Sequence, residues 1–176
     1  MTLIVIIKIL AIIILLLLSA LSSGSETALT AVSKQRAHRQ KDKGAKNANF
    51  ILKIKEFKDE FITGILLANN LFNILATALM TELLVSEFGG LGVSVATIFM
   101  TLMIVIFSEV TPKIFAINKP MTFALKVSKF FYFYTKLIKP IVNLINKVSN
   151  KIIKLIGLNL NADQSKIIEE EFEGAV

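Results

Sequence analysis

The sequence GILLANNLFNILATALM, which occupies Gly64–Met80, decides the fold class of this chain. It has no charged residue, and the apolar stretch around it, about 61–86, is long enough for a helix to cross a bilayer. Two other stretches, about 3–22 and 91–116, meet the same requirement. The sequence therefore predicts an all-α integral membrane protein with three transmembrane helices.

The composition of the 176-residue chain excludes several other classes of protein. The chain is 54% hydrophobic and 19% charged, whereas soluble globular domains are about 25% charged. The same apolar content argues against intrinsic disorder, which needs low hydrophobicity. Because the chain contains no cysteine, neither a disulfide framework nor a thiolate metal site is available.

Basic residues are concentrated on one side of the predicted helices. Residues 34–58 contain nine lysines and arginines, whereas the turn between the second and third helices contains Glu82 and Glu87 and no base. By the positive-inside rule, the N-terminus lies outside the cell membrane (plasma or inner membrane) and the C-terminus lies in the cytoplasm. The net charge of +7 then belongs to a cytoplasmic face, and we expect no nucleic-acid partner. For the first helix, a cleaved signal peptide is the alternative, although its apolar stretch exceeds a usual h-region.

A long amphipathic segment follows the third apolar stretch. Between residues 121 and 156, apolar side chains recur at helical spacing, and the lysines fall within one arc of the helix. Pro140 predicts a break or kink, so we expect two amphipathic helices that lie on the inner leaflet of the lipid bilayer. The alternative is a polar helix face with no role in lipid binding. Residues 157–176 are acidic and are interpreted as a linker.

Polar residues occur inside two of the predicted membrane helices, where each needs a physical reason. Ser19 and Ser23 lie four residues apart near the inner end of the first helix, and Gly24 after them is a candidate helix break. Asn69 and Asn73 share a face of the second helix in the same way. These side chains could either bind a cation or only hydrogen-bond a neighbouring helix, which is common in membranes.

The third helix carries a carboxylate close to a proline. Glu109 precedes Pro112, and a proline leaves a backbone carbonyl one turn earlier, near Ser108, without its usual donor. Broken helices of this kind present carbonyls to cations in transporters. The candidate ligands on the three helices are therefore all oxygen atoms, which select Mg²⁺, Ca²⁺ or Na⁺ over zinc or copper. The alternative for Glu109 is an ion pair with Lys113, four residues further on.

Three motifs resemble the transmembrane domain of the CorC/CNNM family, in order and over nearly the whole chain. They are SALSSGSETAL (19–29), ANNLFNI (68–74) and IFSEVTPK (106–113). The resemblance implies a homodimer with three membrane helices per subunit, a cytoplasmic helical hairpin that matches residues 26–60, and an amphipathic belt after the third helix. It also implies export of Mg²⁺ in exchange for Na⁺.

The same resemblance implies a set of Mg²⁺ ligands. By motif position they are Ser19, Ser23, Asn69, Asn73, Glu109 and the backbone carbonyl around Ser108. The chain departs from the family at Ser108, where glycine usually precedes the glutamate, so a side chain here either crowds the carbonyl or adds a hydroxyl ligand. Family members usually continue into paired CBS domains that bind adenine nucleotide, so we expect such a cytoplasmic region after the linker.

The sequence leaves two functions open. The first is a Mg²⁺ exporter that works by alternating access and is not an enzyme, since the chain has no phosphate-binding loop and no acyl-transfer triad. The second is a membrane scaffold that does not transport but senses or regulates divalent cation flux through a partner. Because the preferences of oxygen sites overlap, the sequence does not separate Mg²⁺ from Co²⁺ or Mn²⁺.

Overall fold

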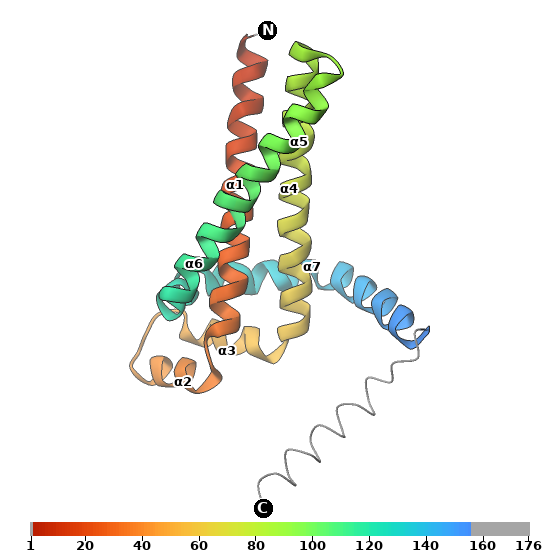
Figure 1. The fold of residues 1–176 in the computed structure, drawn as a ribbon. Coiled ribbons are helices and arrows are strands. Elements are labelled where there is room, and N and C mark those ends of the chain that lie inside the picture. Colours follow the sequence, from red (N-terminus) through yellow and green to blue (C-terminus); the bar gives the residue numbers. More distant parts are fainter. Residues whose placement is uncertain (1, 156–176) are drawn as a thin grey trace, which may run out of the picture. The chain divides into compact units, whose positions relative to one another are not determined.

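The computed structural model describes residues 2–155, and within them the chain is helical and has no strand. Three helical spans are long and apolar enough to cross a membrane (Figure 1). The first is α1 (Thr2–Ala31), and the second is α4 (Lys58–Phe88). The third consists of α5 (Leu91–Met103), the π-helical segment η1 (Ile104–Val110) and α6 (Thr111–Asn118). The predicted all-α class is confirmed, and the predicted linker at 157–176 lies outside the described residues.

The first membrane helix does not break at Gly24 but continues to Ala31. A Cβ atom added to Gly24 would lie 3.0 Å from Cζ of Phe123 and 3.3 Å from the carbonyl oxygen of Pro112. These atoms belong to α7 and α6, so α1 passes very close to both helices at this point. The glycine therefore permits a close helix crossing, which is a common use of small residues in membrane proteins.

The second and third spans are joined by a tight turn at Gly89 and Gly90. Gly89 has a φ of 59°, in the left-handed region that glycine adopts without steric cost. Its N–H donates to the carbonyl of Val85 at 2.9 Å and ends α4. The turn therefore makes α4 and α5 antiparallel neighbours, as Figure 1 shows.

The third span is continuous, so the helix break that we expected before Pro112 is absent. In its place, η1 inserts a wider turn, in which the N–H of Thr111 donates to the carbonyl of Ile106, five residues earlier. Pro112 then lies in the first turn of α6, where a helix tolerates a residue without an N–H. The proline is thus accommodated by a π-helical segment rather than by an interruption.

A helical hairpin packs at the end of the bundle that is remote from the N-terminus. It consists of α2 (Lys34–Asp42), which Ser33 caps by accepting from the N–H of Arg36, and α3 (Ala48–Glu56). The hairpin is rich in lysine and arginine. Burial, and then the charges of Lys58 and Lys34, lower the pKa of Lys55.

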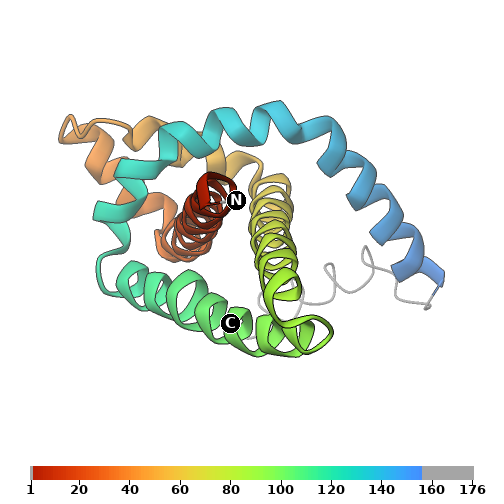
Figure 2. The same cartoon turned by 90° about the horizontal axis from the view of Figure 1, so that it is seen from above.

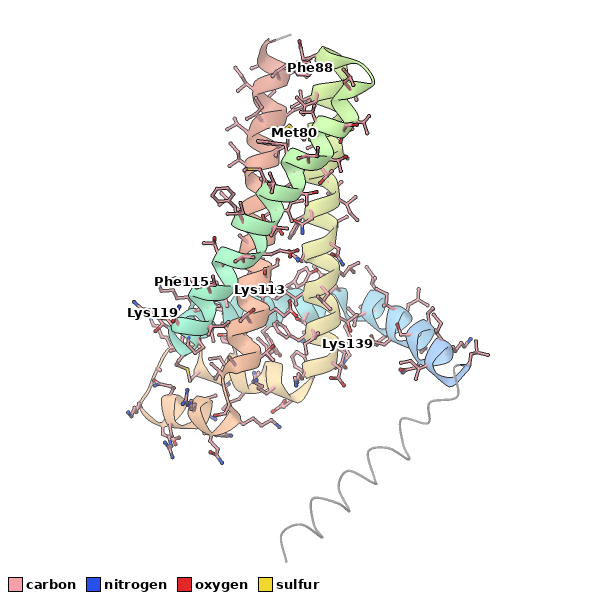
Figure 3. The ribbon with its side chains drawn as sticks, in the orientation of Figure 1. Met80, Phe88, Lys113, Phe115, Lys119 and Lys139 are labelled. Carbon is pink, nitrogen blue, oxygen red and sulfur yellow. The ribbon has the colours of Figure 1, made fainter. Side chains whose placement is uncertain are left out.

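A shared hydrophobic core holds the hairpin to α1, α4 and the first part of α7 (Pro120–Leu155). Its largest members are fully or almost fully buried: Leu29, Val32, Ile51, Ile54, Phe61, Ile65 and Phe131. Viewed along the bundle, α1 lies between the third span on one side and the first part of α7 on the other (Figure 2). Lys113 and Lys119 lie toward the hairpin end, whereas Met80 and Phe88 lie toward the opposite end (Figure 3).

The amphipathic segment is one assigned helix, because α7 runs through Pro140 to Leu155. Of the break or kink expected at this proline, the break is absent, and the kink stays a prediction. The chain nevertheless divides at the same place into two compact units, one ending at Lys139 and the other beginning at Pro140.

Candidate functional site

Three oxygen atoms from two membrane helices converge at the middle of the bundle. The hydroxyl oxygen of Ser19 on α1 lies 2.5 Å from Oδ1 of Asn69 and 2.7 Å from Oδ1 of Asn73, both on α4. A serine hydroxyl has one hydrogen, so it donates to only one of these amide oxygens at a time. Because both amides turn an oxygen toward Ser19, the cluster is rich in lone pairs and short of protons, which is an arrangement that favours a cation.

Ser23 lies one helical turn from Ser19 and is fully buried. Its Oγ is the one buried side-chain polar atom without a hydrogen-bond partner among the described residues. Its neighbours behave differently, since Ser22 and Ser25 donate to the carbonyls of Leu18 and Leu21 at 2.9 and 2.6 Å. A buried polar group without a partner costs free energy, so it calls for a functional reason.

Ser108 is also fully buried, on η1, where it donates to the carbonyl of Leu16 at 3.1 Å. Leu16 lies three residues before Ser19 on α1, so this hydrogen bond holds η1 beside the oxygen cluster. The hydroxyl at position 108 therefore joins two helices in this structure. No local sequence pattern predicts the carbonyl of Leu16 as its partner, because the two residues are 92 positions apart.

Glu109 is partly buried on η1, next to Ser108. Within residues 2–155, no ion pair joins it to Lys113, which is exposed, and no hydrogen bond joins it to Ser19 or the two asparagines. Among the same residues, no group of three acidic, histidine or cysteine side chains could hold a metal ion. A cation site here would therefore consist mainly of hydroxyl, amide and carbonyl oxygens, and Glu109, next to Ser108 on η1, is the predicted carboxylate.

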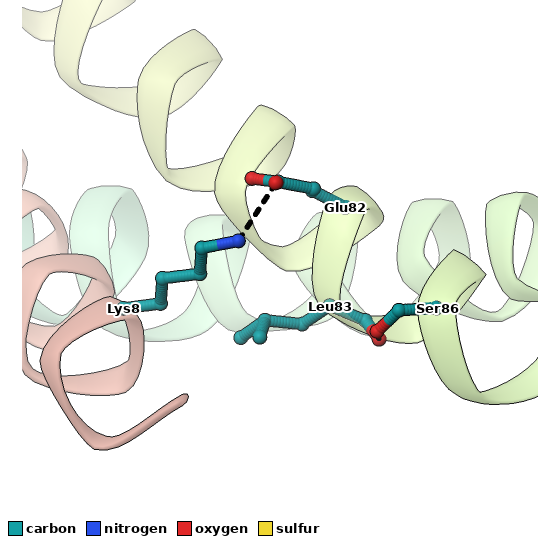
Figure 4. Close-up of polar contacts among 4 residues, drawn as sticks. All are labelled: Lys8, Glu82, Leu83 and Ser86. Atoms are coloured by element: carbon teal, nitrogen blue, oxygen red, sulfur yellow. Dashed lines mark hydrogen bonds and ion pairs between the residues drawn. The ribbon is translucent and has the colours of Figure 1, made fainter. Parts of the chain in front are cut away.

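A groove of about 710 Å³ extends from this cluster toward the N-terminal end of the bundle. Asn73 is one of its lining residues, and the others are Ile74, Thr77, Ala78, Thr81, Glu82, Val85 and Ile104. Our sequence analysis missed this feature, although Thr77 and Thr81 continue the four-residue spacing of Asn69 and Asn73. At the end of the groove that is remote from Asn73, the Glu82 carboxylate pairs with the Lys8 ammonium at 2.7 Å (Figure 4).

Fold and site together define a class of membrane protein in which three helices that can span a membrane surround a cluster of side-chain oxygen atoms, beside a basic helical hairpin. The chain belongs to the CNNM family, since residues 10–176 match the model of the cyclin M transmembrane N-terminal domain. It is therefore a membrane protein.

Three curated relatives are similar to most of this chain. A UPF0053 protein of Haemophilus influenzae is 33% identical over 152 residues, which are 86% of this chain and 36% of the relative. The UPF0053 inner membrane protein YfjD of Escherichia coli is 31% identical over 147 residues, covering 84% and 34%. A chloroplastic DUF21 domain-containing protein of Arabidopsis thaliana is 30% identical over 149 residues, covering 85% and 22%. The chain thus spans about a third of the length of its bacterial relatives.

Proposed function

We propose that this chain exports Mg²⁺ across the cell membrane by alternating access, driven by Na⁺ entry, and that it does so as a transporter and not as an enzyme. The observation that carries the proposal is the convergence of Ser19 Oγ with the amide oxygens of Asn69 and Asn73 inside the membrane bundle. Oxygen ligands select hard cations, and Mg²⁺ prefers six of them in octahedral geometry. Membership in the CNNM family supports the choice of cargo.

The other predicted ligands complete the site in this proposal. Ser23 supplies a buried hydroxyl that has no hydrogen-bond partner among the described residues. Glu109 supplies a single carboxylate after a rearrangement that brings η1 closer to the cluster, and the backbone near Ser108 supplies a carbonyl. One carboxylate leaves a divalent ion incompletely neutralised, which suits a site that must release its ion after each cycle.

The proposal extends to the oligomeric state, the orientation in the membrane and the regulatory domains. We propose a homodimer in the lipid bilayer, with the basic hairpin in the cytoplasm and the N-terminus outside. In this arrangement, CBS-type regulatory domains bind adenine nucleotide and act on the helices through the hairpin and α7.

Flux measurements on proteoliposomes test the transport function. Liposomes loaded with Mg²⁺ and a fluorescent indicator should lose the signal when they contain the wild-type chain. The Glu109→Ala and Asn69→Ala variants should lose at least nine-tenths of this flux. Asn70→Ala is the matched control, because Asn70 is exposed on another face of α4 and should keep wild-type flux. Wild-type flux from either of the first two variants would show that the ligands are wrongly assigned.

The second candidate is a sensor or scaffold that binds divalent cations without moving them. The same oxygen cluster would support it, because binding and transport share the ligands. The two functions differ in one outcome: a sensor binds Mg²⁺ in detergent but gives no flux in liposomes that contain only this chain.

Cysteine labelling tests the orientation, since the chain contains no native cysteine. Ser86→Cys, near the α4–α5 turn, should react with a membrane-impermeant maleimide added to intact cells. His38→Cys, in α2, should react only after the membrane is permeabilised. The reverse pattern would place the hairpin outside.

A further inference from the structure

We infer that the groove along α4 is the route by which the cation leaves the oxygen cluster, and that Glu82 is a cation-binding carboxylate at its outer end, which the Lys8 ammonium occupies while no metal is there. This inference rests on the proposed transport function. It adds a second binding site for a divalent cation, and it gives a function to the Lys8–Glu82 ion pair, which lies apart from the predicted ligands.

The first support is the continuity between the cluster and the groove. Asn73 belongs to both, because its amide oxygen accepts from Ser19 and its side chain lines the groove. A cation held by Asn73 therefore already lies at the inner end of the groove.

The second support is a line of oxygen atoms along one face of α4. Thr77 and Thr81 follow Asn73 at intervals of four residues and line the groove with it. Their hydroxyls donate to the carbonyls of Asn73 and Thr77, each at 2.8 Å. A hydroxyl that donates its one hydrogen still has lone pairs, so both threonines can offer oxygen to a passing cation. The surface of the groove is otherwise mainly apolar and open along its side, and Ile74 and Ile104 offer no competing ligand.

The third support is the position of Glu82. It lies nine residues beyond Asn73, which corresponds to about 14 Å along the helix, or about half of a hydrocarbon core of about 30 Å. If the cluster is near the middle of the membrane, Glu82 is close to its surface. Figure 1 places this end of α4 beside the N-terminal end of α1.

The fourth support is the chemistry of the ion pair. The Lys8 ammonium lies 2.7 Å from a Glu82 carboxylate oxygen, and the Glu82 side chain is 62% exposed, whereas that of Lys8 is 24% exposed (Figure 4). A lysine within a membrane helix is costly and calls for a partner. Here the Lys8 ammonium is the positive charge that pairs with the Glu82 carboxylate, and a metal ion that binds this carboxylate must displace it.

Site-directed labelling tests the route without a flux measurement. In the cysteine-free chain, reconstituted in liposomes, Thr77→Cys and Thr81→Cys should react with a cationic methanethiosulfonate at least tenfold faster than Thr97→Cys. Thr97 is the matched control, because its hydroxyl also bonds a carbonyl four residues earlier, but it is exposed on α5 outside the groove. Millimolar Mg²⁺ should slow the first two reactions at least threefold. Equal rates for all three variants would overturn the inference.

Flux through charge variants tests the role of the ion pair. Glu82→Gln should lower Mg²⁺ flux at least tenfold, whereas Glu87→Gln, at an exposed acid outside the groove, should keep it. Lys8→Met should raise flux at limiting Mg²⁺ at least twofold, because it frees the carboxylate. A purely structural ion pair would instead give lower flux in both Lys8→Met and Glu82→Gln, and that result would overturn the inference.

The outcomes also separate this inference from the transport function. If Asn69→Ala abolishes the flux but Glu82→Gln leaves it unchanged, the groove and Glu82 are not the exit route, and the assignment of the oxygen cluster as the transport site is unaffected. Absence of flux from the wild-type chain would overturn the transport function itself.

Discussion

Replacement of Ser23 by alanine should make the protein more stable and at the same time remove its response to Mg²⁺. The Ser23 hydroxyl is fully buried and has no partner among the described residues. Protein mutational data put the cost of such a group at about 1–3 kcal/mol. Alanine keeps the Cβ atom, removes the oxygen and has a higher helix propensity than serine. The metal-free variant should therefore gain about 1–2 kcal/mol of unfolding free energy.

Thermal unfolding in detergent measures this gain. For a chain of this length, 1 kcal/mol corresponds to about 2–4 °C, so the Tm of the metal-free Ser23→Ala variant should rise by about 2–8 °C. The wild-type protein should gain about 2.7 kcal/mol at a Mg²⁺ concentration of about 100 times Kd. The variant should gain little or nothing at the same concentration, because a ligand has been removed.

Ser22→Ala is the control for this experiment. Ser22 is also buried, but its hydroxyl donates to the carbonyl of Leu18 on the same helix. Its loss should change the Tm only slightly and leave the Mg²⁺ response intact. If Ser23→Ala instead lowers the metal-free Tm and keeps the full Mg²⁺ response, Ser23 has a structural partner and is not a ligand.

Two further predictions concern the turn and the belt helix. A Cβ atom at Gly92 would clash with the carbonyl oxygen of Leu84, so Gly92→Ala should destabilise the protein by about 1–3 kcal/mol in thermal unfolding, whereas Gly90→Ala, with open space around it, should not. The Tyr134 hydroxyl donates to the carbonyl of Gly64 at 3.1 Å, and burial raises the pKa of this phenol above 10.0. Its contribution to stability should be complete below pH 10 and should be lost as the pH rises through the folded-state pKa, so Tyr134→Phe should flatten the denaturant midpoint against pH in that range. An unchanged pH profile in this variant would show that the hydrogen bond contributes nothing.

The three spans and the shared face of Asn69 and Asn73 could be predicted from the sequence because both depend on local patterns, whereas the role of these residues as cation ligands stays a prediction. Apolar length alone decides whether a helix can cross a bilayer, and the three predicted spans lie within the observed helices. A spacing of four residues places Asn69 and Asn73 on one face, and the structure brings both to Ser19. No contact between helices had to be known for these predictions.

The sequence predicted poorly wherever a residue acts through a distant neighbour. Gly24 could be a helix break or a crossing point, and only the position of Phe123 on α7 decides for the crossing. Pro112 could interrupt its helix or follow a wider helical turn, and the structure shows the wider turn, η1. Within η1, the Ser108 hydroxyl donates to the Leu16 carbonyl of α1, a contact between helices that the sequence alone does not show. The pair of Lys8 and Glu82 spans 74 positions of the chain, so no local pattern predicts it.

The two proposed cation contacts differ in which interaction an arriving cation must displace. At the inner cluster, a single hydroxyl proton lies between three oxygens, and a neutral hydrogen bond contributes only about 1 kcal/mol, so an arriving cation displaces little. At the outer end, a charged pair at 2.7 Å must open before a cation can bind Glu82. In the proposed route, departure past Glu82 requires this ion pair to open, whereas filling of the inner cluster does not. An ion pair that stays closed while the inner cluster fills would keep the proposed route from being open at both ends, which is what distinguishes a transporter from a channel.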